Sequence, residues 1–159
     1  MVFVKGLNMI FEVVYTALVY IACAYSLYII GRRNNVKNSW LAFVPVFQYY
    51  IIGSICEEYQ LLGVRIKRLE WTMCGLALIQ ILARFSTVQG AGIIGLAVGI
   101  IIALIMHKFF YLFCPERALI YAILCGFGRL PLAIILYLIK DKPMQMSAGA
   151  YHYPFANKP

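Results

Sequence analysis

The chain has 159 residues, of which 64% are hydrophobic and 13% charged, and its formal net charge is +8. A soluble domain has about 45–50% apolar and about 25% charged residues, and a short chain cannot bury such an excess in a core. The composition therefore excludes an ordinary soluble domain. It predicts an all-α integral membrane protein with one membrane domain, residues 1–139, and a polar C-terminal tail, residues 140–159.

The first predicted element covers residues 9–30, an apolar run followed by Gly31 and the polar segment RRNNVKN. Its 22 residues reach about 33 Å as a helix, enough to cross a hydrocarbon core of about 30 Å. The run is longer than the roughly 7–15 apolar residues of a signal peptide core. We therefore expect an uncleaved transmembrane helix.

The segment SWLAFVPVFQYYIIGSI, residues 39–55, is at the lower length limit for a span and contains Pro45. We expect an interfacial or re-entrant helix–break–helix. Six basic residues flank it: Arg32, Arg33, Lys37, Arg65, Lys67 and Arg68. They share one side only if the segment does not cross, and the positive-inside rule makes that side cytoplasmic.

Three further spans are predicted at residues 71–88, 93–113 and 118–139. Four spans put both termini outside, with eight Lys and Arg on the cytoplasmic side against five outside, Lys140 and Lys142 among the five. This bias is small, so the inverted orientation stays open. The basic loops are expected to meet anionic lipids, and their position between apolar runs argues against nucleic-acid binding.

Small residues recur at every fourth position of the third span: Ala91, Gly95, Gly99 and Ala103. Such a face lets two helices approach closely. We expect it to pack against a neighbouring span, with contact to another subunit as the alternative. At the end of this span we expect Lys108 to extend to the headgroups, although a proton relay through His107 is the alternative. Arg84 is expected to behave like Lys108.

Enzymatic chemistry has no support in the sequence. The five cysteines form no C-x-x-C pair and have no histidine at ligand spacing, which indicates neither a metal site nor a cofactor. No serine–histidine–acid set, phosphate-binding glycine loop or H-E-x-x-H motif occurs. We expect a protein that is not an enzyme.

The segment at 39–55 follows a short basic loop and has the pattern W-L-A-x-x-P…Y-x-x-G. With HKFFYLFCPERALIYAIL and ILYLIKDKP further along, it resembles small polytopic bacterial membrane proteins that are uncharacterised. The resemblance implies residence in the bacterial cytoplasmic membrane and no particular chemistry. The sequence departs from that pattern most clearly at GFGRLP, residues 126–131.

Arg129 lies at the midpoint of the fourth span, where a charge costs at least about 2.5–3.5 kcal/mol. It keeps its proton, because the pKa of arginine exceeds about 12. Gly126, Gly128 and Pro131 weaken the helix around it. We expect Arg129 to face the bundle interior, a wet cavity or a partner; the alternative is a span that stops early near an interface. The candidate partner side chains are Gln80, Gln48 and Glu12.

Two functions follow from these observations. The first is an accessory or assembly subunit of a larger membrane complex, bound to other membrane subunits or to itself. The second is a small transporter or pore in which the broken fourth helix and Arg129 face an anion path. The surroundings of Arg129 distinguish the two.

Overall fold

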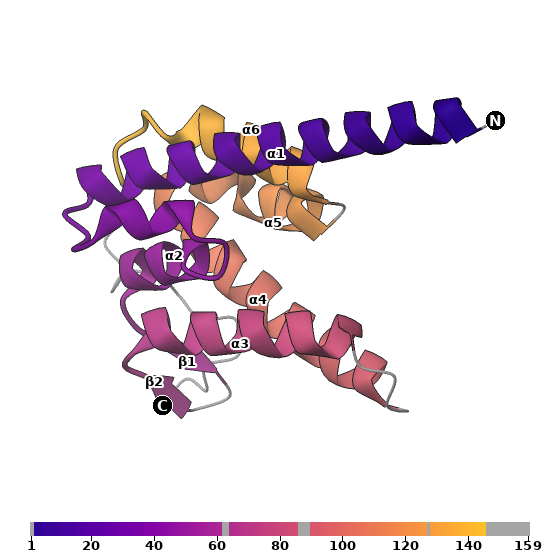
Figure 1. The fold of residues 1–159 in the computed structure, drawn as a ribbon. Helices are drawn as coiled ribbons and strands as arrows, with labels where there is room; N and C mark the ends of the chain where they lie inside the picture. Colours follow the sequence, from indigo (N-terminus) through magenta and orange to yellow (C-terminus); the bar gives the residue numbers. More distant parts are fainter. Residues whose placement is uncertain (1, 62–63, 86–89, 127, 146–159) are drawn as a thin grey trace.

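The computed structural model describes residues 2–61, 64–85, 90–126 and 128–145. Six α-helices lie within them: α1 (Val2–Arg33), α2 (Gln48–Cys56), α3 (Leu69–Phe85), α4 (Ala91–Phe113), α5 (Ala118–Gly126) and α6 (Arg129–Ile139) (Figure 1). Two 3-10 helices, η1 (Ser39–Phe43) and η2 (Pro115–Arg117), and an antiparallel hairpin of β1 (Tyr59–Leu61) and β2 (Val64–Ile66) lie between them. The expected all-α class is confirmed, with this small hairpin as an addition.

Two of the described helices are long and apolar enough to cross a membrane, Met9–Arg33 in α1 and Ala91–Phe113 in α4. They correspond to the runs expected at 9–30 and 93–113. Only 28% of the most apolar stretch of α1 and 39% of that of α4 is buried inside the molecule. Most of their apolar surface is therefore not covered by the described chain.

Helix α3 corresponds to the run expected at 71–88, of which residues 86–88 lie outside the described residues. It packs between α2 and α4. A Cβ atom at Gly53 would lie 2.6 Å from the Cα atom of Glu70, so α2 approaches the start of α3 as closely as two backbones allow. Glycine is required at this contact because any side chain would push the helices apart.

Residues 39–56 form a first helical hairpin, made of η1, a turn at Pro45 and α2. This is the expected helix–break–helix. The hairpin begins beside the end of α1, where a Cβ atom at Gly31 would lie 3.2 Å from Ser39 Oγ. It extends along α1 to Phe43, whose carbonyl accepts a hydrogen bond from the Tyr20 hydroxyl. Helix α2 then returns, and Ile51 again lies next to Gly31.

Residues 118–139, expected as one span, instead form a second helical hairpin. Helices α5 and α6 have only nine and eleven residues and pack against each other. The chain after α6 returns to the end of α4, where the amide of Gln145 donates to the carbonyl of Leu112 at 2.9 Å. The return is possible because Gly128 makes a turn that a helix cannot make, and because α6 packs along α1.

Both hairpins begin and finish at the same end of the molecule, where α1 and α4 end and α3 begins. We call this end the basic end, because Arg32, Arg33, Arg117 and Lys140 lie there. The buried core is concentrated near it, around side chains such as Leu27, Ile30, Phe109, Phe110 and Phe113. The beginning of α1 extends beyond the other helices at the opposite end (Figure 1).

Candidate functional site

The turn of the second hairpin carries the GFGRLP segment. Gly128 has φ 150° and ψ −177°, a conformation open in practice only to glycine. Arg129 is the first residue of α6, and Pro131 lies in the first turn, where a missing backbone donor costs nothing. Pro131 therefore helps to begin a helix here and does not interrupt one.

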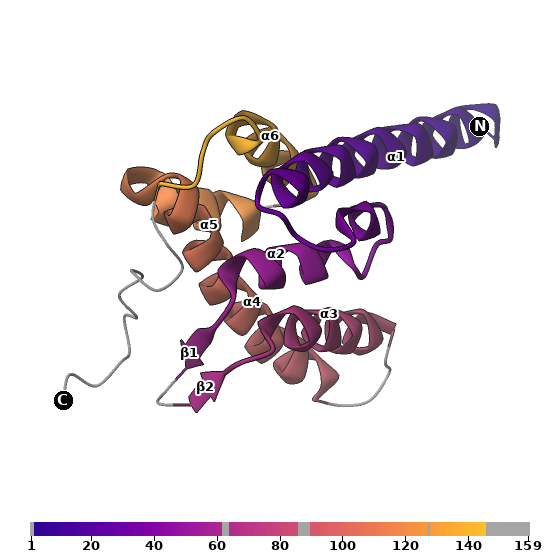
Figure 2. The ribbon, with the colours of Figure 1, turned by 90° about the vertical axis from the view of Figure 1, so that its left-hand side faces the viewer.

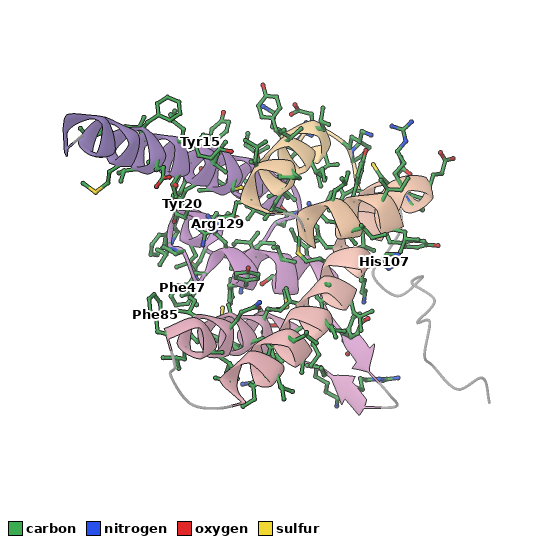
Figure 3. All side chains as sticks on the ribbon, turned by 90° about the vertical axis from the view of Figure 1, so that its right-hand side faces the viewer. Tyr15, Tyr20, Phe47, Phe85, His107 and Arg129 are labelled. Atoms are coloured by element: carbon green, nitrogen blue, oxygen red, sulfur yellow. The ribbon has the colours of Figure 1, made fainter. Side chains whose placement is uncertain are left out.

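A cavity of about 260 Å³ lies between this turn and α1. Its lining residues come from two segments far apart in the sequence: Tyr15, Thr16 and Val19 of α1, and Gly128, Arg129, Leu130 and Pro131. Figure 3, which views the molecule from the end opposite the basic end, shows Arg129 near Tyr15, with which it lines the cavity. The sequence analysis identified Arg129 as a candidate site residue but not the lining residues of α1. The polar side chains of Tyr15 and Thr16 within an apolar run could have indicated them.

Arg129 brings a positive charge to the turn of the second hairpin. Arg129 is the first residue of α6, and the helix dipole adds partial positive charge at that N-terminus. The side chain is exposed, and among the described residues it makes no ion pair or hydrogen bond. A carboxylate or another anion would be stabilised at this position by both contributions.

The three expected partners of Arg129 lie in different places. Glu12 is exposed on α1, one helical turn before Tyr15 and Thr16 and on their face. Gln80 lies on α3, with its Nε2 atom 3.4 Å from where a Cβ atom of Gly99 would be. Gln48 begins α2, and its buried Nε2 atom has no hydrogen-bond partner among the described residues. None of the three lines the cavity, and Glu12 lies one helical turn from the α1 residues that do.

The small-residue face of α4 lies against α3 over part of its length. A Cβ atom at Gly95 would be 3.5 Å from the Cβ atom of Ala83, which is ordinary packing distance. Ala91 is half-buried, whereas Ala103 is exposed. The neighbouring helix at this face thus belongs to the same chain at Gly95 and Gly99.

Lys108 does not extend to the surface, and that expectation was wrong. The side chain is 1% exposed, and its ammonium group donates to the carbonyl of Glu58. The ammonium also lies 6.0 Å from the ring centre of buried Tyr59. A favourable cation–π contact and a charge-assisted hydrogen bond stabilise the buried ammonium.

His107 is half-buried and its ring lies 6.4 Å from that of Tyr111. The side chain of Arg84 lies outside the described ones.

Lys140 at the end of α6 is held between two tyrosines. Its ammonium group lies 3.7 Å from the ring centre of Tyr137 and 5.7 Å from that of Tyr25. Arg33 joins the same region, donating to the Lys140 carbonyl at 3.2 Å and approaching Asp141 at 3.9 Å. These contacts connect the end of α6 with the end of α1.

All five cysteines are free thiols. Among the described residues no group of three or more His, Cys, Asp or Glu side chains could hold a metal ion.

No protein-family model matches the chain, and neither the curated proteins nor the solved structures contain a significant match.

Proposed function

We propose that the protein is a multi-pass membrane protein that acts as a non-enzymatic accessory or assembly subunit and contacts its partner at the end of the molecule that carries Arg129. Membrane residence is supported by the outward apolar surface of α1 and α4. Large apolar side chains are exposed on α1 from Met9 onward; Phe11, for example, is 74% exposed. Such a surface is stable in lipid or against another membrane protein and unfavourable in water.

The observation that carries the subunit role is the unpaired charge of Arg129. The cavity residue Thr16 lies fifteen residues before Gly31 on α1, about 22 Å along a helix axis. If Gly31 marks the hydrocarbon boundary at the basic end, Arg129 lies within a core of about 30 Å. A permanent cation at that depth requires a partner group. The described chain pairs none with it, and a carboxylate on a partner helix supplies one.

The test is purification of the tagged full-length protein in mild detergent, with mass spectrometry of co-eluting membrane proteins. We expect a partner with an Asp or Glu in a span to be retained by Arg129→Lys and lost with Arg129→Ala. Lys67→Ala, an exposed cation at the basic end, is the matched control and should retain the partner. Arg129→Asp should recover binding when the partner carboxylate is replaced by Arg. Recovery of the wild-type protein alone as a stable monomer contradicts the subunit role.

The cavity favours a second candidate function, the anion path. About 260 Å³ is room for a small anion, and Arg129 and the N-terminus of α6 attract negative charge. This function requires anion flux through proteoliposomes that contain the purified protein alone. Flux that is absent, or unchanged by Arg129→Ala, rejects it.

A further inference from the structure

The charges of the molecule are segregated along its long direction. Ten of its fourteen Lys and Arg lie at the basic end: Arg32, Arg33, Lys37, Arg65, Lys67, Arg68, Lys108, Arg117, Lys140 and Lys142. Five of its six acidic residues lie there too, so the basic end carries a net charge of +5, ten minus five. Among the described residues at the opposite end, Lys5 lies near the start of α1, Arg84 lies near the end of α3, and Arg129 lies at the turn of the second hairpin.

This segregation depends on the second hairpin. A continuous span at 118–139 would carry Lys140 and Lys142 to the opposite end. Instead, Arg33 holds Lys140 and Asp141 beside the end of α1, and the Lys142 ammonium lies 3.3 Å from the Cys114 thiol at the end of α4. Figure 2, which looks onto the basic end, shows the loop after α1 and the two strands toward the viewer.

Aromatic side chains accompany this charge. Both tryptophans lie near the basic end, Trp40 at the start of η1 and Trp71 at the start of α3, and they are 60% and 57% exposed. Trp71 packs edge-on to Tyr50 at 5.6 Å, and exposed Tyr25 and Tyr137 flank Lys140. Exposed tryptophan and tyrosine beside lysine and arginine are typical of the headgroup layer of a bilayer.

From these observations we infer that α1, α3 and α4 cross the membrane, that both hairpins are re-entrant from the leaflet at the basic end, and that the basic end binds the anionic headgroups of that leaflet. The inference rests on the proposed membrane residence but not on the proposed partner. The 17 residues of α3 are at the short end of the spanning range, about 17–25. The nine and eleven residues of α5 and α6 are too short to cross. Three crossings put the two termini on opposite sides, with the C-terminal side cytoplasmic.

Accessibility of added cysteines to a membrane-impermeant maleimide in intact bacterial cells tests the orientation. The sites are Lys37→Cys and Lys142→Cys at the basic end and Gly92→Cys at the opposite end, all exposed in the full-length chain. We expect labelling of Gly92→Cys in intact cells, and of the other two only after lysis. Labelling of Lys142→Cys but not Lys37→Cys in intact cells restores four spans and overturns the inference. Labelling of both overturns the cytoplasmic assignment.

Thermal unfolding in reconstituted vesicles tests the lipid contact. We expect a higher midpoint in phosphatidylcholine vesicles that contain phosphatidylglycerol than in phosphatidylcholine alone, and loss of much of that difference in the double variant Lys140→Gln with Lys142→Gln. Inorganic phosphate added to neutral vesicles should not reproduce the rise. A rise with phosphate alone, or one that the double variant retains in full, contradicts headgroup binding. Co-purification of a partner changes none of these outcomes, so this inference and the subunit role fail separately.

Discussion

At the scale of single residues, Gly53 is the position where packing is most sharply defined. The nearest atoms to an added Cβ are backbone atoms of Leu69 and Glu70, at 2.6–2.8 Å, and backbone cannot rotate away. We therefore predict that Gly53→Ala lowers the free energy of unfolding by about 1–3 kcal/mol. Gly75→Ala is the matched control, since nothing lies within 4 Å of its added Cβ. Helix propensity favours alanine there by up to about 1 kcal/mol. Unfolding in mixed detergent micelles measures the stability of both variants. Equal changes in the free energy of unfolding for Gly53→Ala and Gly75→Ala would contradict the close approach of α2 to α3.

Lys108 leads to a second prediction at this scale. Lys108→Met keeps the volume of the side chain but leaves the carbonyl of Glu58 without this donor. A buried group that loses its hydrogen bond costs about 1–3 kcal/mol, and we expect Lys108→Met to be destabilised by that amount in the same assay. Lys67→Met changes an exposed lysine and should stay within about 0.5 kcal/mol of wild type. A Lys108→Met protein as stable as the control would show that the ammonium contact contributes nothing.

At the scale of elements, the turn of the second hairpin depends on one glycine. Gly128 has a positive φ, whereas Gly126 does not, and neither has atoms within 4 Å of an added Cβ. Gly128→Ala should therefore cost about 1–3 kcal/mol through backbone strain alone, and Gly126→Ala should be close to neutral. Thermal unfolding of the two variants separates strain from packing. The reverse order of stability would mean that the turn has a different conformation.

The elements also show what the sequence could predict. The long apolar runs allowed α1 and α4 to be predicted, because length and hydrophobicity can be read directly from the local sequence. The interruption at GFGRLP was visible for the same reason. The direction that the chain takes after this segment could not be predicted, because it depends on the packing of α6 along α1, which is far away in the sequence. The burial of Lys108 could not be predicted from the sequence either, because its hydrogen-bond acceptor is a backbone carbonyl, which every residue has.

At the scale of the whole molecule, thiol reactivity reports on packing. Four of the five cysteines are buried, and Cys125 is half-buried. We predict that a small maleimide labels the folded protein first at Cys125, and all five thiols after unfolding in SDS. Cys125→Ser should abolish the fast labelling. Fast reaction of Cys56 in the folded protein would contradict the structure around α2.

The Arg33–Asp141 contact has a consequence for biosynthesis. Helix α6 packs along α1, so this contact cannot form until the chain has been synthesised through α6. Helices of nine and eleven residues are also too short for insertion machinery to treat as independent spans. In the proposed membrane topology, the second hairpin therefore enters the membrane as a unit against α1, whose contact surface for α6 faces lipid until then.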